Sequence, residues 1–231
     1  MVFLSLTRPS ALQVDEAVSH GSRQGFNYRH VGKTEGAPPL DDELVRERWT
    51  VDHTRVQVGK GRAAYEEGKR ALKSWQHFQL GWTTVDASTR VEKGSKARVS
   101  PSVSAEPSRV CSAAQVCVVA RAVLPWTRNP LEIVYAKEGS RKVPASDGKG
   151  GTNAKVFSFA HGCLGGHLLA GEERFAMEWR KDDDSVWYEI YTFSKPAHAL
   201  SLATYPVVRL LQKKFASDST AAMQRTLSRP S

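Results

Sequence analysis

The segment from Lys155 to Ala197 constrains the fold of this 231-residue chain more than any other part. Its sequence is KVFSFAHGCLGGHLLAGEERFAMEWRKDDDSVWYEIYTFSKPA. Three strand-like runs are separated by a glycine-rich connection and an Asp-rich turn, a pattern typical of antiparallel strands. A long amphipathic helix pattern follows from Tyr205-Pro206, since proline is tolerated in a first helical turn. The chain is therefore predicted to be α+β, with an antiparallel sheet against its C-terminal helix.

The triplet Asp182-Asp183-Asp184 predicts the turn between the last two strands. If the turn is centred on Asp183, four residue pairs share one face of the sheet. These pairs are Trp179 with Trp187, Met177 with Glu189, Phe175 with Tyr191, and Glu173 with Phe193. The predicted inner face thus carries two glutamates among aromatic rings.

A glutamate on an aromatic inner face must be paired, hydrogen-bonded, protonated or hydrated, because burying a lone charge is costly. One interpretation is a structural carboxylate held by arginine or backbone N–H groups. The other is a polar anchor within an apolar cavity that binds a small apolar or amphipathic molecule. The predicted ligand-binding residues are Trp126, Tyr135, Glu173, Phe175, Met177, Trp179, Trp187, Glu189, Tyr191 and Phe193.

The connection HGCLGGHLLAGEE contains His161, His167, Glu172 and Glu173. It lacks a His-Glu-x-x-His or equivalent spacing, so neither a metal site nor a cofactor is predicted. An enzyme is the second hypothesis: His167, with Glu172 or Glu173, would act as general acid or base in an isomerase, cyclase or hydrolase. The structural alternative is that His167 bonds the local backbone and holds the glycine-rich turn.

Charge and cysteine content narrow the remaining classes of protein. The net charge of +9 favours a third hypothesis, an interaction module that uses the basic residues Lys69, Lys73, Lys213 and Lys214. Nucleic acid is a disfavoured partner, because stacking aromatics do not accompany the basic residues. Three cysteines without Cys-x-x-Cys spacing indicate a reducing compartment, which is predicted to be the cytoplasm with a plastid as alternative. No run of about 18 apolar residues predicts a membrane span, and the sequence does not specify an oligomeric state.

Residues 1–49 are predicted to form an N-terminal extension that packs on a domain of residues 50–231. Within this domain, a helix is predicted at about 62–77, with Tyr65, Gly68, Leu72 and Trp75 on one buried stripe. Flexible segments are predicted at about 99–114, which is rich in Ser and Pro, and at 139–154. Further strands are predicted at 26–31, 50–58, 82–85, 115–124 and 131–137.

Several motifs together resemble uncharacterised protein family 0548, known from plants and bacteria. They include FLSLTRPS, GFNYRHVG, VGKGRAAYEEGKRALKSWQHF, VLPWTRNPLEIVY, GHLLAGEERF, VWYEIYTFSKPAHALS and YPVVRLLQKKF, and they cover nearly the whole chain. The resemblance implies a helix-grip fold like that of pollen-allergen and START-like proteins, in which a curved antiparallel sheet wraps a long C-terminal helix around an apolar cavity. It implies no particular activity. Residues that match its most distinctive segment are Gly166, His167, Gly171, Glu172, Glu173, Phe175, Trp187, Glu189, Phe193, Ser194 and Pro196. The stretch at 99–114 departs from the family pattern.

Overall fold

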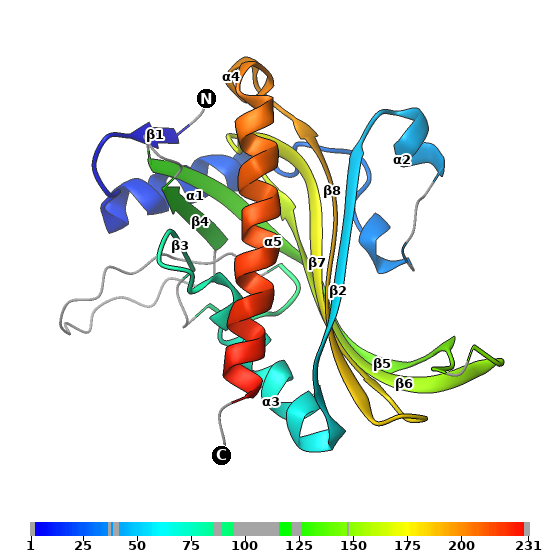
Figure 1. Cartoon of the computed structure of the whole chain (residues 1–231). Coiled ribbons are helices and arrows are strands. Elements are labelled where there is room, and N and C mark those ends of the chain that lie inside the picture. Colours follow the sequence, from blue (N-terminus) through cyan, green and yellow to red (C-terminus); the bar gives the residue numbers. More distant parts are fainter. Residues whose placement is uncertain are drawn as a thin grey trace.

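One antiparallel sheet organises the chain, and a long C-terminal helix crosses its concave side (Figure 1). The computed structural model describes residues 3–36, 38, 42–85, 89–94, 116–121, 126–146 and 148–228, with the backbone alone for 42 and 116–121. The predicted flexible insertion at 99–114 lies outside the described residues. The sheet curls into a half-barrel, so the prediction of an α+β chain with a curved antiparallel sheet and a C-terminal helix is confirmed.

The sheet has the strand order β2-β8-β7-β6-β5-β4-β3, and β1 pairs with the beginning of β5. Its strands are β1 Phe3–Ser5, β2 Thr50–Lys60, β3 Thr83–Thr84, β4 Val116–Arg121, β5 Trp126–Pro144, β6 Gly151–Cys163, β7 Leu169–Arg180 and β8 Ser185–Pro196. The helices are α1 Ala11–Gln24, α2 Asp42–Arg46, α3 Gly61–Lys73, α4 Ala199–Ala203 and α5 Tyr205–Leu227, with 3₁₀ turns η1 Lys33–Glu35 and η2 Gln76–Phe78. None of the helices in these described ranges has the length and apolarity that a membrane crossing requires.

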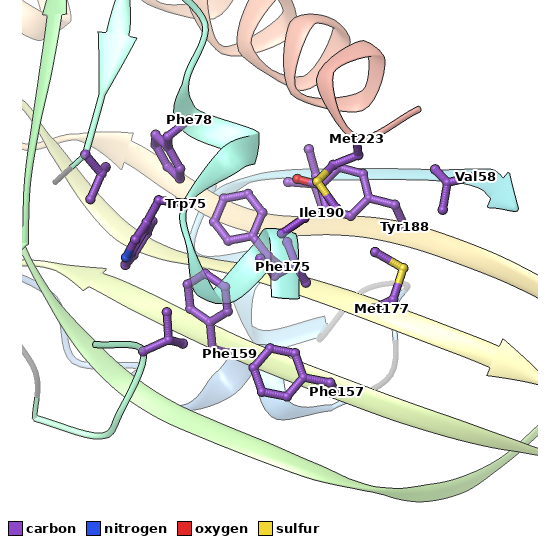
Figure 2. Packing of buried hydrophobic residues seen from close by; sticks show 14 of the residues in the cluster. Val58, Trp75, Phe78, Phe157, Phe159, Phe175, Met177, Tyr188, Ile190 and Met223 are labelled. Carbon is purple, nitrogen blue, oxygen red and sulfur yellow. The ribbon is translucent and has the colours of Figure 1, made fainter. Parts of the chain in front are cut away.

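The predicted helix at about 62–77 corresponds to α3 and the following turn η2. Its predicted stripe is confirmed, because Tyr65, Gly68, Leu72 and Trp75 are all buried. Trp75 adopts a left-handed backbone conformation with φ of 59°, which ends the helix before η2. Figure 2 shows the resulting core, in which Trp75 and Phe78 gather with Phe159 and Phe175 of the sheet, and Trp75 contacts Phe159 edge to face.

The predicted hairpin exists, but its predicted register was wrong by one residue. Trp179 pairs with Val186, and Glu178 pairs with Trp187. The connection Lys181–Asp184 has four residues, and an even number rules out a turn centred on a single residue. Asp184 takes a left-handed conformation with φ of 60°, and Asp183 accepts hydrogen bonds from the backbone N–H and hydroxyl of Ser185. A shift of one residue moves every β8 side chain to the opposite face of the sheet.

The corrected register separates the predicted aromatic face into two. Glu173, Phe175, Met177 and Trp179 of β7 lie on the concave face, toward α3 and α5. The β8 residues Trp187, Glu189, Tyr191 and Phe193 lie on the convex face. Part of that face is covered by the N-terminal segment, of which Tyr28, Leu44 and Trp49 pack with Phe193. Both faces of β7 and β8 are therefore buried, which sequence alternation alone did not reveal.

Two boundaries differ from the predictions. The segment 139–154 mostly forms strand, because β5 extends to Pro144 and β6 begins at Gly151, which leaves only a short connection. Residues 26–31 form a single bridge from Phe26 to Leu164 instead of a strand.

Helix α1 was not predicted, although Ser10 and Gln13 form a capping box at its start.

Candidate functional site

A cavity of about 650 Å³ lies between the concave face of the sheet and helices α4 and α5. Its volume is in the range of about 300–1,000 Å³ that is usual for small-molecule sites. The sheet contributes Thr54, Leu131, His161, Cys163, Leu169, Glu173, Ile190 and Thr192, and α5 contributes Val207, Val208, Leu211, Gln212, Phe215 and Ala216. Most of these side chains are apolar, so the cavity suits an apolar molecule with few polar groups.

Exposed apolar residues lie where the cavity meets the surface. Leu200 of α4, Val207 of α5 and Leu4 of β1 line the cavity and are 41%, 49% and 37% exposed. In Figure 1 these elements lie together at the same end of the molecule as the N-terminus. The cavity is therefore lined by solvent-exposed apolar side chains at this end.

Several hydrogen bonds hold α5 over the cavity, among them the following. Arg209 donates two hydrogen bonds to the carboxylate of Asp52 on β2, at 2.6 and 2.7 Å. Gln212 donates to Ser194 Oγ at 2.9 Å. Farther along the helix, the hydroxyls of Tyr188 and Ser219 hydrogen-bond at 2.8 Å. These contacts fix α5 to the sheet, and the cavity lies beneath the first half of the helix.

Glu173 is the acidic group that faces this cavity from β7. Its side chain is 23% exposed, and Oε2 lies 3.6 Å from Nε2 of His161 on β6, too far for a hydrogen bond. Burial, followed by the negative charge of Asp52, raises the pKa of Glu173 to about 8. Glu173 therefore keeps its proton at neutral pH.

The neighbouring histidines are neutral. Burial lowers the pKa of His161 to about 3, and both of its ring nitrogens lack a hydrogen-bond partner. Burial also lowers the pKa of His167 to about 4. Nδ1 of His167 accepts a hydrogen bond from the backbone N–H of Leu169 at 2.9 Å, so this ring does hold the glycine-rich turn. Burial raises the pKa of the Cys163 thiol, which argues against a reactive thiolate.

The Glu172 side chain points to the convex face, opposite to that of Glu173, although Glu172 borders the cavity. It is 2% exposed and accepts hydrogen bonds from the Tyr28 hydroxyl, from the backbone N–H groups of Gly32 and Thr34, and from the Thr34 hydroxyl. A carboxylate with four donors is a structural group. It ties the N-terminal segment to the sheet.

Glu189 belongs to a second convex-face network, so the structure does not place it as an anchor inside the cavity. It accepts hydrogen bonds from Arg174 and pairs with His53 at 3.1 Å. Burial alone would raise its pKa, but these partners and the charge of Arg141 lower it to about 2. Glu178 in the same network pairs with Arg55 and Arg141, each at 2.6 Å.

The predicted ligand-binding residues are thus distributed over three regions. Glu173 lines the cavity; Phe193 borders it, but its ring packs against Tyr28 and Trp49 on the other face. Phe175, Met177 and Trp179 lie on the concave face and pack into the hydrophobic core. Residues placed elsewhere are Trp126 beside α1, Tyr135 against Thr34, and Trp187, Glu189 and Tyr191 on the convex face.

Sequence reasoning did not select His161 or Asp52 as parts of this site. His161 lies two residues from both Phe159 and Cys163 on β6, and side chains two residues apart in a strand share one face. The sequence could therefore have placed His161 on the face of Phe159. Asp52 pairs with Thr192 across β2 and β8, a contact that depends on the correct register. The apolar face predicted for the C-terminal helix does contribute Val208, Leu211 and Phe215.

Among the described residues, His30, Glu43 and Glu47 bring three donor atoms within 4.8 Å of one another on the N-terminal segment. Arg29 and His30 pair with Glu47, and Lys33 pairs with Glu43 at 3.0 Å. These carboxylates are thus neutralised by side-chain cations. Of the basic residues predicted for an interaction surface, Lys69 pairs with Glu66 and Lys214 pairs with Asp218.

Comparison with known proteins identifies the family. The chain is 40% identical over 228 residues to a UPF0548 protein of Arabidopsis thaliana, covering 96% of this chain and 97% of the relative. It is 26% identical over 229 residues to a UPF0548 protein of Dictyostelium discoideum, covering 95% and 94%. A UPF0548 protein of Deinococcus radiodurans is 28% identical over 213 residues, covering 90% and 91%. The profile of the family described as "Domain of unknown function (DUF1990)" matches residues 27–222, and the chain belongs to this family.

Proposed function

We propose that this protein binds a small apolar or amphipathic molecule between the sheet and α5, in the manner of a helix-grip protein. The observation that carries the proposal is the cavity of about 650 Å³, which is lined mainly by apolar side chains. An apolar cavity of this size with a few polar groups is the usual form of a small-molecule site. The helix-grip assignment is supported by the curled sheet and the long helix across its concave side.

Two tryptophan variants on α5 test the proposal. Val208 lines the cavity, whereas Leu210, two residues farther along, is 68% exposed and does not line it. We expect wild-type protein and L210W to bind the neutral dye Nile red equally, because the added ring of L210W enters solvent. V208W fills the cavity, so its affinity for the dye should fall by about tenfold or more. Circular dichroism establishes that both variants fold. Equal dye binding by V208W and L210W, or no binding by the wild type, would refute the proposal.

Acid–base catalysis on a bound molecule is the second candidate function. Glu173 supports it, because a carboxyl that keeps its proton at neutral pH inside an apolar cavity is a suitable general acid. His161 is the neighbouring acceptor at 3.6 Å, while His167 already bonds the backbone. The roles first assigned to His167 and Glu172 therefore pass to His161 and Glu173 in this proposal.

The test for catalysis begins with native mass spectrometry of gently purified protein, which identifies a molecule that stays bound. That molecule is then incubated with wild-type protein and with E173Q, and products are followed by liquid chromatography and mass spectrometry. Catalysis predicts a product from the wild type and at least about a hundredfold slower formation by E173Q. Unchanged substrate with both proteins would leave binding as the function.

A further inference from the structure

Glu173 is unusual among the glutamates of the central hairpin because its carboxyl has no hydrogen-bond partner among the described residues. The other three are each held by several donors: Glu172 by Tyr28, Gly32 and Thr34, Glu178 by Arg55 and Arg141, and Glu189 by Arg174 and His53. The Glu173 side chain is 23% exposed, and a carboxyl that has lost most of its contact with water without gaining a partner is costly in a folded protein. The cavity that Glu173 faces is therefore the place where its carboxyl can meet a hydrogen-bond partner.

A second unpartnered group lies directly behind Glu173. His161 is 4% exposed, both of its ring nitrogens are buried without a hydrogen bond, and Nε2 lies 3.6 Å from Oε2 of Glu173. His161 also lines the cavity. Two polar side chains without hydrogen-bond partners therefore converge at one point of a mainly apolar wall.

From this convergence we propose that the ligand is a neutral apolar alcohol, whose hydroxyl group binds at Glu173 with His161 behind it. The inference rests on the proposed binding function and specifies the chemical class of the ligand. A hydroxyl offers one donor and two acceptor positions. The ligand hydroxyl accepts a hydrogen bond from the protonated carboxyl of Glu173. It donates its own proton to an acceptor atom of the neutral pair formed by Glu173 and His161.

The charges around the site favour a neutral ligand group. The titratable groups around Glu173 are Asp52 on β2, His161 and Cys163 on β6, His167 in the β6–β7 connection, and Tyr188 on β8. The cation of α5 nearest to them, Arg209, already holds Asp52 with two hydrogen bonds. Lys213 borders the cavity, but its side chain is exposed to solvent.

A charged ligand group fits these surroundings less well. A carboxylate would add a negative charge near Asp52 in a mainly apolar cavity, and Arg209 is already bonded to Asp52, so the new charge would lose its hydration without gaining a cation. An alkylammonium would have to lose its own hydration and displace the proton of Glu173, a desolvation cost that a buried ion pair often fails to recover. An alcohol leaves the protonation of the site unchanged.

The experiment compares three ligands with one carbon chain: 1-decanol, decanoate and decylammonium, each displacing Nile red at pH 6.5. Wild-type protein should prefer decanol, and its ratio of decanol to decanoate affinity should exceed the ratio of E173L by about fivefold or more. E138Q is the matched control, because Glu138 lies on the same sheet outside the cavity lining, bonded to Tyr65 and Lys69. It should keep the wild-type ratio.

The pH dependence separates an alcohol from an amine. Decanol displaces water from the cavity and should bind with constant affinity from pH 6 to 7.5, then more weakly above pH 8 as Glu173 ionises. Preferred binding of decylammonium, with affinity that rises toward pH 8, would overturn the inference. Equal decanol-to-decanoate ratios in wild type and E173L would also overturn it, while Nile red binding in the same samples would leave the cavity function standing. Absence of Nile red binding would refute the cavity function itself.

Discussion

Glu172 and Glu173 are neighbours in the chain, but they have opposite roles because consecutive strand residues face opposite sides of a sheet. Glu172 is buried among four donors that belong to the N-terminal segment. Glu173 faces the cavity and lacks such donors. The sequence identified both carboxyls as candidates, and strand alternation correctly placed Glu173 on the face of Phe175. Only the β8 residues predicted beside it were misplaced, because their face depends on the register between the two strands.

At the residue scale, Glu173 predicts how stability depends on pH. Its pKa of about 8 in the folded state lies above the ordinary value of 4.5, so the folded state holds a proton that the unfolded state has released. Its contribution to stability is present below pH 4.5 and is lost as pH rises toward 8. His161 and His167 act oppositely: their folded pKa values of about 3 and 4 lie below 6.5, so their contribution is lost as pH falls below 6.5.

These opposing slopes predict maximal stability near pH 6.5. From there to pH 8, the free energy of unfolding of the wild type should fall by about 2 kcal/mol, since each group contributes about 1.4 kcal/mol per pH unit. E173Q should be nearly level over the same interval. Urea titrations followed by circular dichroism measure both curves, with E138Q as the control that should retain the wild-type fall. Parallel curves for wild type and E173Q would contradict the protonation assigned to Glu173.

At the scale of elements, most strands could be predicted from the alternation of apolar and polar residues. The two predicted helices followed from the 3.6-residue period of apolar residues. Hydrophobic spacing placed Tyr65, Leu72 and Trp75 on one buried stripe, and all three are buried, although Trp75 lies just after the end of α3. The pairing of β7 with β8 was predicted, but its register could not be, because the register depends on whether the intervening turn has an odd or an even number of residues. The three aspartates favour a turn without specifying its length. The site residues contributed by β8 were misplaced for this reason.

Gly171 at the start of β7 provides a prediction at this scale. Its φ of +140° is one that other residues rarely adopt, and the backbone of Phe193 occupies the position of a Cβ atom. G171A should therefore lose about 3 kcal/mol or more of unfolding free energy, because neither backbone can move independently. Gly139 of β5 has nothing within 4 Å of the equivalent position, so G139A should stay within about 1 kcal/mol of the wild type. Similar denaturation midpoints for the two variants would contradict this account.

At the scale of the whole molecule, the N-terminal segment is the second cover of the sheet. Tyr28, Leu44 and Trp49 pack over Phe193, and Tyr28 and Thr34 bond Glu172. The sequence indicated an extension that packs on the domain, and it left open which face is covered. Strands that are buried on both sides do not alternate cleanly, which is why the sequence predicted a single inner face for β7 and β8.

Removal of this segment tests its contribution. A chain of residues 50–231 should fail to show a cooperative thermal transition, because Glu172 would lose its four donors and Phe193 its cover. Circular dichroism melts and two-dimensional NMR spectra of the shortened and the full chain provide the measurement. A chain starting at residue 10, which lacks only β1 and the residues before α1, is the control and should melt cooperatively. A sharp transition in the shorter chain would show that residues 50–231 form an independent domain.

The four residues of the connection Lys181–Asp184 also have an evolutionary consequence. Inserting or deleting a single residue there, unless a bulge absorbs it, would exchange the faces of every β8 side chain and would carry Arg174's partner Glu189 to the wrong side. Relatives in which this hairpin has lengthened or shortened should therefore differ from this chain by two residues at a time.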